Sequence, residues 1–259
     1  MSAAAVAAGA VAVESANVVG VTTVNATQGK FYMIGAQFED VGGGEISIQD
    51  FVTGDFVGVD FDENYGYMQT APKLQVWTPS GYIGCYYLND AYDLDKDDGT
   101  TYEGWADESG NYVTDTVSAG MAAWFMDSNE ACTLNVKGQV LGTDGTIQTT
   151  ANKFFMVANP YPVETAINSA DIDWDGIVGV DFDENYGYLQ TAPKLQIWTP
   201  AGYIPCYYLN DAYDLDKDDG TTYEGWADES GNYVTDNFPV GYAAWFYAGT
   251  DVDITFAAP

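Results

Sequence analysis

An internal repeat constrains the fold of this chain more than any other feature. Residues 57–115 match residues 178–236 at an offset of 121, and only four positions within this block differ. The flanking segments keep the same pattern, with KFYMIGAQF answered by KFFMVANPY and GMAAWF answered by GYAAWF. A period of this length indicates duplicated domains rather than a solenoid of short repeats.

The boundary between the two copies falls in KGQVLGTDG, where glycine and aspartate cluster. We therefore expect one domain over residues 17–140 and a second over residues 141–259. Residues 1–16 precede the first copy and form an apolar N-terminal extension, because their side chains are small and carry no charge before Glu14.

Each copy has the pattern of an all-β domain. Short segments rich in β-branched and aromatic residues alternate with Gly, Asp, Asn and Pro, and no segment sustains a long amphipathic helical period. The sequence predicts two tandem homologous domains, each a β-sandwich or barrel-like. In the first copy the expected strands are residues 18–24, 31–38, 74–77, 82–88, 112–114, 122–125 and 132–136.

The charge balance excludes several classes of function. Acidic residues number 39 against 7 basic residues, all of them lysine, and histidine is absent, so the net charge is -32. A nucleic-acid partner is excluded because its binding needs a basic face. No histidine-based triad can form, and no pair of carboxylates stands out as a glycosidase pair, so we expect no enzyme. No segment has the length and hydrophobicity to span a membrane.

The three cysteines, Cys85, Cys132 and Cys206, form no CxxC pair, and their number is odd. Cys85 and Cys206 occupy the same position in the two copies, each among aromatic residues of an expected strand. Buried thiols are the favoured interpretation, and a disulfide bond is the alternative.

An acidic segment, DLDKDDGTTYE, recurs at residues 93–103 and 214–224. Calcium takes six to eight oxygen ligands, and aspartates at alternate positions of a glycine-bearing loop can supply them. The alternative is a solvated acidic hairpin. The candidate Ca²⁺ ligands are Asp93, Asp95, Asp97 and Glu103, with Asp214, Asp216, Asp218 and Glu224 in the second copy.

A third acidic motif occurs in the second copy alone. Asp171, Asp173 and Asp175 precede Gly176 and match the start of a calcium-binding loop. The same residues alternate polar and apolar, which is also the pattern of an exposed strand.

Aromatic residues offer a second kind of site, because exposed Trp and Tyr rings stack on sugars. The favoured interpretation, however, is that most of these rings pack the two cores. The candidates, in repeat pairs, are Trp77 and Trp198, Tyr82 and Tyr203, Trp105 and Trp226, and Trp124 and Trp245.

The N-terminal segment has two interpretations. It is either the end of a signal peptide or an extended strand that pairs with a sheet edge of a neighbouring subunit. Pairing of this kind would produce a homopolymer. The candidate assembly residues are Ala3, Ala4, Ala5, Val6, Ala7, Ala8, Ala10, Val11 and Val13.

The order KFFMVANPYP, KLQIWTPAGYIPCYYL, EGWADESG, PVGYAAWF, DITF resembles a module found in tandem in uncharacterised secreted bacterial proteins. That module carries a GxxLIANP-like strand, a W-x-x-x-GY strand pair and a PGxGFW-like strand. The first copy departs from the pattern at GAQFED and SAGMAAWF. The resemblance covers nearly the whole chain and implies export and a β-rich fold.

These patterns favour a secreted, non-enzymatic structural protein, located outside the cell or at its surface. We expect it to be a subunit of a filament or surface layer assembled through β-strand contacts. The alternative is a calcium-dependent carbohydrate-binding or adhesive module with a glycan partner.

Overall fold

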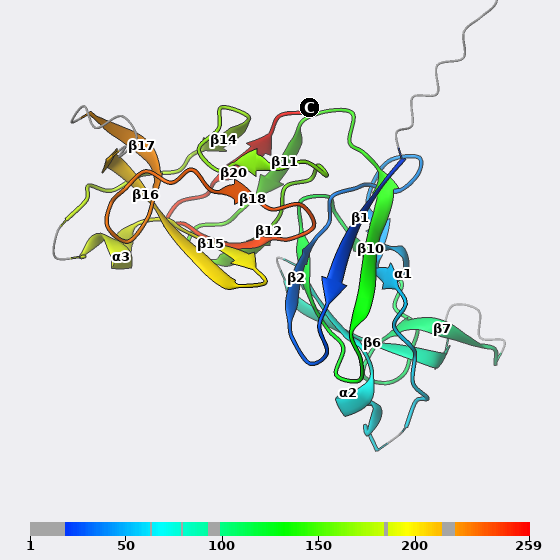
Figure 1. The fold of residues 1–259 in the computed structure, drawn as a ribbon. Coiled ribbons are helices and arrows are strands. Elements are labelled where there is room, and N and C mark those ends of the chain that lie inside the picture. Colours follow the sequence, from blue (N-terminus) through cyan, green and yellow to red (C-terminus); the bar gives the residue numbers. More distant parts are fainter. Residues whose placement is uncertain (1–18, 63, 79, 93–98, 184–185, 214–220) are drawn as a thin grey trace, which may run out of the picture.

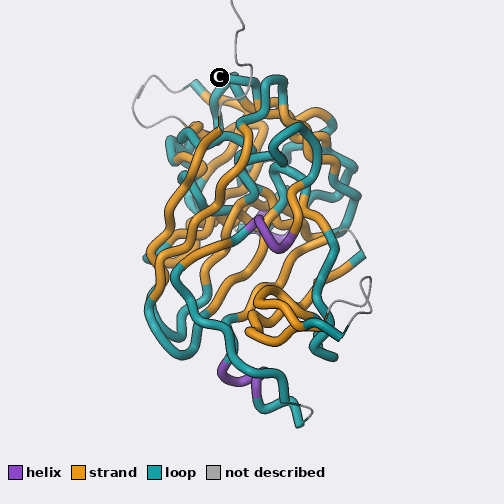
Figure 2. Tube along the Cα trace, turned by 90° about the vertical axis from the view of Figure 1, so that its right-hand side faces the viewer, coloured by secondary structure: helices purple, strands orange, loops and turns teal. Residues whose placement is uncertain are grey.

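The computed structural model describes residues 19–62, 64–78, 80–92, 99–183, 186–213 and 221–259. The described chain is all-β, as predicted from the sequence (Figures 1 and 2). Its helices are single turns of four residues each, namely α1 (Ile48–Phe51), α2 (Tyr67–Thr70) and α3 (Tyr188–Thr191).

The first half of the chain forms two main antiparallel sheets. The larger sheet has the order β2-β9-β5-β6-β7, the second has the order β1-β10-β4, and β3 pairs with β8. Their bounds are β1 (Val19–Ala26), β2 (Tyr32–Gly35), β3 (Ile46–Ser47), β4 (Thr53–Gly54), β5 (Lys73–Thr78), β6 (Gly81–Tyr92), β7 (Thr101–Ala106), β8 (Thr116–Val117), β9 (Ala122–Met126) and β10 (Cys132–Gln139).

The second half repeats this arrangement. Its sheets have the orders β12-β19-β15-β16-β17 and β11-β20-β14, and β13 pairs with β18. Their bounds are β11 (Gly145–Gln148), β12 (Phe154–Val157), β13 (Thr165–Ala166), β14 (Ile172–Asp175), β15 (Lys194–Thr199), β16 (Gly202–Tyr213), β17 (Thr222–Ala227), β18 (Asn237–Phe238), β19 (Ala244–Tyr247) and β20 (Asp253–Phe256).

Each five-stranded sheet is open and presents one face to a core. In β5, Leu74 and Val76 are buried, whereas Gln75 between them points to the opposite face. Residues Val24 of β1 and Leu134 of β10 belong to the same core cluster as Leu74, so the two sheets of the first half enclose that core. Because both sheets remain open, the arrangement is sandwich-like rather than barrel-like.

The β5–β6 hairpin sets the position of the aromatic residues described below. Its turn requires Gly81, whose φ of 127° lies where side-chain-bearing residues are rarely found. The register then places Trp77 opposite Tyr82, on the sheet face that points away from the core. The same turn in the second half uses Gly202, with φ 131°.

The two halves lie side by side and contact each other reciprocally (Figure 1). Gly35 N donates to Gly241 O at 3.1 Å, and Ala158 N donates to Gly120 O at 2.7 Å. In the repeat, Ala158 corresponds to Gly35 and Gly241 to Gly120, so each half gives the other the same bond. Such exchange of equivalent contacts is the property of an isologous, approximately two-fold interface.

Ring contacts across the interface follow the same reciprocity. Tyr32 packs on Trp198 with ring centroids 5.2 Å apart, and Trp77 lies 6.3 Å from Phe155, which corresponds to Tyr32. The core of the first half accordingly includes Met156 from the second. The predicted domain boundary falls between β10 and β11, and the division into two domains stays a prediction.

The three cysteines are free thiols and are buried, which confirms the favoured interpretation and makes the disulfide alternative wrong. Within the described residues, no helix has the length and apolar character needed to cross a membrane.

Candidate functional site

An open groove of about 290 Å³ lies where the two halves meet. The first half contributes Trp77 and Tyr82, and the second contributes Phe154, Gln196 and Trp245. Four aromatic rings and one amide therefore line a groove that neither half could form alone. We call it the aromatic groove.

Strand register explains why these side chains share one surface. Gln196 of β15 lies opposite Trp245 of β19, and Trp77 of β5 lies opposite Tyr82 of β6. In β15 the neighbours of Gln196, Leu195 and Ile197, point into the core. The groove is therefore built from the outer faces of both five-stranded sheets.

Edge-to-face contacts fix the orientation of the rings. Trp77 meets Tyr82 at 5.0 Å and 71°, and it meets Trp245 at 5.8 Å and 76° across the junction of the halves. Trp245 in turn meets Phe154 at 6.2 Å and 87°. Such T-shaped pairs are favoured by the ring quadrupoles, so the groove is held in shape before any ligand binds.

Two of the rings remain open to solvent. Tyr82 is 45% exposed and Phe154 is 51% exposed, while the indole rings of Trp77 and Trp245 are half-buried behind them. Large apolar side chains with this exposure, grouped in one groove, indicate a contact surface rather than core packing.

Besides the Gln196 amide, the residues that line the aromatic groove include one hydroxyl, that of Tyr82. It donates to the Met156 sulfur at 3.9 Å and accepts a hydrogen bond from the Trp124 indole. Partial burial raises the pKa of Tyr82, the Trp124 bond opposes this, and the neighbouring Tyr203 adds to it. The phenol thus stays protonated at neutral pH and serves as a hydrogen-bonding group.

The lining of the aromatic groove is mainly aromatic. Its described residues present ring faces, one amide and one phenol, and none is a carboxylate, thiol or amine.

Sequence reasoning identified part of this site. Trp77, Tyr82 and Trp245 were candidates, whereas Phe154 and Gln196 were not. The signal for Gln196 was present in KLQIWT, where it alternates with buried residues and must face outward. Phe154 stands directly before the buried Phe155, and only the start of β12 distinguishes the two rings.

Five of the eight aromatic candidates do not line the aromatic groove, namely the half-buried Trp124, the exposed Tyr203 and three buried tryptophans. Trp105 and Trp226 are completely buried, which confirms the core-packing interpretation for these two rings. Each packs against rings of its own half, as Trp105 does on Tyr87 at 5.2 Å. Trp198 is 8% exposed, because Tyr32 and Tyr242 cover it on both sides at 5.2 Å.

Most of the predicted calcium ligands lie outside the described residues, namely Asp93, Asp95, Asp97, Asp214, Asp216 and Asp218. Glu103 and Glu224 are described, and both are exposed on β7 and β17. In the part of the chain that the structure covers, no three Asp, Glu or Cys residues lie close enough to hold a metal ion.

Asp173 and Asp175 lie on the exposed side of β14, and the exposed Asp171 directly precedes this strand. Their carboxylates alternate with the buried Ile172 and Trp174, which is the exposed-strand pattern that the sequence offered as the alternative. Ser169 Oγ donates to Asp171 at 2.8 Å. The structure does not bring these aspartates together as one ligand set, as far as the described residues extend.

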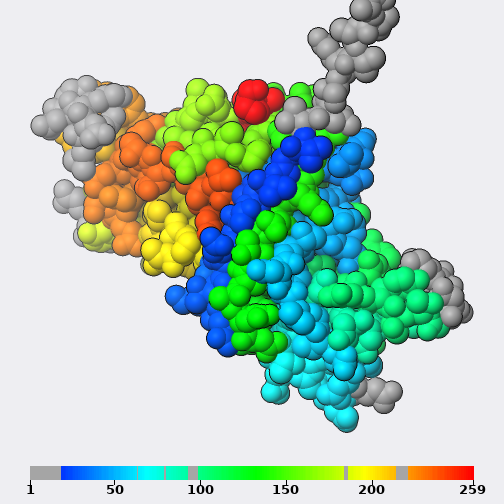
Figure 3. Space-filling view, turned by 45° about the vertical axis from the view of Figure 1, so that its right-hand side comes forward, coloured from blue at the N-terminus to red at the C-terminus, as the bar shows by residue number. Residues whose placement is uncertain are grey.

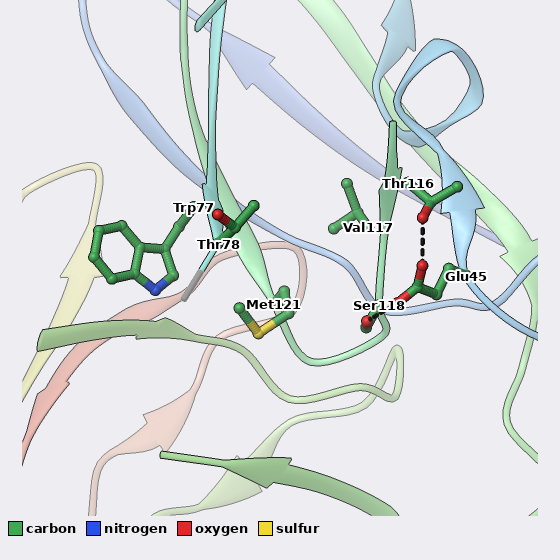
Figure 4. Close-up of a pocket in the computed structure, with 7 residues that line it drawn as sticks. All are labelled: Glu45, Trp77, Thr78, Thr116, Val117, Ser118 and Met121. Atoms are coloured by element: carbon green, nitrogen blue, oxygen red, sulfur yellow. Dashed lines mark hydrogen bonds between the residues drawn. The ribbon is translucent and has the colours of Figure 1, made fainter. Parts of the chain in front are cut away.

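A smaller pocket of about 170 Å³ lies on another side of Trp77 (Figure 4). Glu45 accepts hydrogen bonds from Thr116 and from Ser118, and these bonds lower its pKa. Because its carboxylate is already paired with two hydroxyls of the same chain, this pocket offers fewer free groups than the aromatic groove.

The predicted assembly residues between positions 3 and 13 lie outside the described residues. The chain matches no protein-family model, no curated protein and no solved structure. The resemblance to tandem modules of secreted bacterial proteins therefore stays a prediction, and the proposals below depend on the geometry of the described residues.

Proposed function

We propose that this protein is a non-enzymatic binding module for neutral carbohydrate, and that the sugar binds in the aromatic groove. One observation carries the proposal. Exposed rings of Tyr82 and Phe154, supported edge-on by Trp77 and Trp245, line an open groove together with the Gln196 amide. This corresponds to the carbohydrate-binding alternative among the functions expected from the sequence.

The chemistry of a pyranose suits this lining. Its ring carries C–H groups on its flat faces and hydroxyls around its edge, so the faces pack on aromatic rings while the edge needs hydrogen-bonding groups. The Gln196 amide both donates and accepts, and the Tyr82 oxygen, whose proton is donated to Met156, can accept. A few polar groups among aromatic side chains are typical of sites that fix the orientation of a small ligand.

The charge of the chain favours a neutral sugar over an acidic one. With a net charge of -32, the protein repels uronate or sulfate groups over the whole of its surface. The aromatic groove has no Lys among its lining residues to offset this repulsion. Neutral hexose and pentose polymers are therefore the expected ligands.

Affinity electrophoresis against neutral and acidic polysaccharides tests the proposal. We expect neutral polymers to retard the wild-type protein and the Phe154→Ala variant to migrate unretarded. The Tyr65→Ala variant is the matched control, because Tyr65 is 52% exposed but lies outside the aromatic groove. Equal retardation of all three proteins, or retardation by acidic polymers alone, would overturn the proposal.

We propose self-association as a second candidate function, supported by the free edge of β1. β1 pairs only with β10, so one side of its backbone is unpaired within the described sheets. Val19 and Val21 are 61% and 59% exposed and line a groove of about 280 Å³ beside Val41. Figure 3 shows this strand, in dark blue, at the surface.

An exposed edge with apolar side chains is a template for adding a strand from another chain. Addition of that kind would build the filament or surface layer expected from the sequence, and the extracellular location belongs to the same proposal. Replacing Val19 and Val21 with Lys should reduce the sedimentation-average mass, while Val178→Lys, at another exposed valine, should not. A wild-type protein that stays monomeric at all concentrations would contradict this candidate.

A further inference from the structure

The aromatic groove is part of a longer row of rings, which extends beyond it in both directions. Trp77 contacts Tyr82, and Trp124 of β9 lies opposite Gln75, which is two residues before Trp77 on the same face of β5. Trp124 meets Phe31 at 6.1 Å and 85°. At the other end, Phe154 meets Tyr247 at 4.9 Å. The aromatic row thus consists of Phe31, Trp124, Tyr82, Trp77, Trp245, Phe154 and Tyr247.

The aromatic row combines exposed rings with half-buried ones. Phe31, Tyr82 and Phe154 are 52%, 45% and 51% exposed, whereas the indoles beside them are half-buried. The T-shaped contacts mean that each half-buried indole supports an exposed ring by its edge or face. Three exposed contact surfaces therefore follow one another across both halves.

Each end of the row has its own amide. Gln75 is exposed and lies opposite Trp124, as Gln196 lies opposite Trp245. Phe31, Gln75 and Trp124 correspond in the repeat to Phe154, Gln196 and Trp245. The first half thus presents the same ring and amide groups as the second.

The two halves differ at one position beside their equivalent tryptophans, and this position lies outside the near-identical block of the repeat. Tyr242 covers Trp198 at 5.2 Å, while the equivalent position beside Trp77 is Met121. Trp77 instead packs on Tyr82 and on Trp245, and this is what joins the row across the junction of the halves. The row is therefore continuous through Trp77 and does not depend on Trp198.

We infer that the ligand is a linear neutral polysaccharide with equatorial linkages, and that one chain lies along the aromatic row over both halves. This inference rests on the proposed function and specifies its ligand. A single sugar would fill the aromatic groove and leave Phe31 and Gln75 unused. A β-1,4-linked chain is a flat ribbon whose successive rings expose apolar faces, and it matches a succession of exposed rings with amides at both ends.

A proline-rich peptide is the competing ligand for an aromatic surface, since polyproline helices dock on aromatic grooves. Such grooves recognise the peptide by donating hydrogen bonds to its carbonyls. Here the indole nitrogen of Trp77 is buried, so it cannot donate to a peptide carbonyl. The amides Gln75 and Gln196, which both donate and accept, suit sugar hydroxyls better.

A length series tests the inference by calorimetry with β-1,4-linked gluco-, manno- and xylo-oligosaccharides of two to eight residues. We expect the affinity of the wild-type protein for one series to rise by ~10-fold or more from the disaccharide to the hexasaccharide and then level off. Phe31→Ala should lose ~10-fold for the hexasaccharide and keep the disaccharide affinity. Phe154→Ala should weaken the binding of both, and Tyr65→Ala should match the wild type.

The outcomes separate the inference from the proposed function. Binding that does not change with length, or a Phe31→Ala variant identical to wild type, overturns the inference and leaves the aromatic groove as a sugar site. If no oligosaccharide binds, the inference is overturned. If no neutral polysaccharide retards the protein either, the proposed function is overturned as well. Binding of an octaproline peptide by the wild type, lost in Phe154→Ala, would assign the aromatic row to a peptide instead.

Discussion

At the scale of single residues, one side-chain amide in each half holds the backbone around a buried tryptophan. Gln49 Oε1 accepts from Trp105 N at 2.8 Å, and Gln49 Nε2 donates to Trp105 O and Val113 O, both at 2.7 Å. In the second half Asn168 makes the same three bonds to Trp226 and Val234. Two different amino acids thus serve one structural purpose.

Gln49→Leu should destabilise the protein by about 2–4 kcal/mol, because it leaves the Trp105 N–H and the Val113 carbonyl without this partner. Asn168→Leu should have a similar effect for the same reason. Urea unfolding followed by tryptophan fluorescence measures both. Gln28→Leu is the control, since Gln28 is exposed and makes one bond, to Ser128 O. If the three variants unfold at the same urea concentration, the hydrogen bonds of the Gln49 and Asn168 amides contribute little to the stability of the protein.

Burial raises the pKa of Cys85, Cys132 and Cys206 from 9.0 to about 12. The folded state therefore keeps these thiols protonated at a pH where the unfolded chain ionises them. Their contribution to stability is fully present below pH 9.0 and is lost as the pH rises from 9.0 toward about 12. Melting temperatures should stay level up to pH 9.0 and fall above it.

Thiol labelling is a direct check on the same burial. At pH 8.5 the native protein should react with iodoacetamide at least ~10-fold more slowly than the protein unfolded in urea, because only the thiolate reacts. Rapid modification of any one cysteine in the native protein would show that this thiol is accessible.

At the scale of elements, the sequence predicted strands well where alternation was clear. Segments 74–77, 82–88, 122–125 and 132–136 correspond to β5, β6, β9 and β10. The strand expected at 112–114 is wrong, since residues 111 and 112 make only isolated bridges. β7 was missed because Glu103 and Gly104 interrupt its pattern, and its pairing with β6 depends on residues far away in the sequence.

The candidate site was harder to predict than the strands for a physical reason. Alternation shows that one ring of a strand points inward and the next outward, as for Phe125 and Trp124. It does not show what covers the outer face. Trp77 and Trp245 come from different halves, and only the contact between the halves brings their ring centroids to within 5.8 Å of each other. No local pattern in the sequence contains that information.

Calcium binding is a prediction at the scale of loops. The two DLDKDDG segments connect β6 to β7 and β16 to β17, so a bound ion would link the ends of paired strands. Calcium at about 100 times its dissociation constant should raise the melting temperature by about 5–10 °C. Replacing Asp95 and Asp216 with Asn should abolish this rise. An equal rise with sodium chloride of the same ionic strength would reduce the effect to charge screening.

At the scale of the whole molecule, the reciprocal interface gives the repeat a structural role. Each half binds the other through equivalent groups, such as Gly35 with Gly241 and Ala158 with Gly120. The aromatic groove depends on this interface, because its rings come from both halves.

Gly35→Ala should disrupt the interface. An added Cβ would lie 2.5 Å from Ala158 Cβ and 2.8 Å from Tyr242 O, so the two halves would have to move apart. We expect a loss of about 1–3 kcal/mol in stability, typical of overpacking, together with weaker glycan binding. Gly142→Ala is the control, because its Cβ would meet nothing within 4 Å. Unchanged stability and binding in Gly35→Ala would mean that the halves do not depend on this close contact.

The most direct test of the account is a crystal structure of the protein with the β-1,4-linked hexasaccharide that binds most tightly. We expect one sugar chain along the outer faces of both five-stranded sheets. Its rings should stack on Phe154, Tyr82 and Phe31, and its hydroxyls should form hydrogen bonds with Gln196 and Gln75. A sugar bound elsewhere on the molecule, with the aromatic row uncovered, would contradict it.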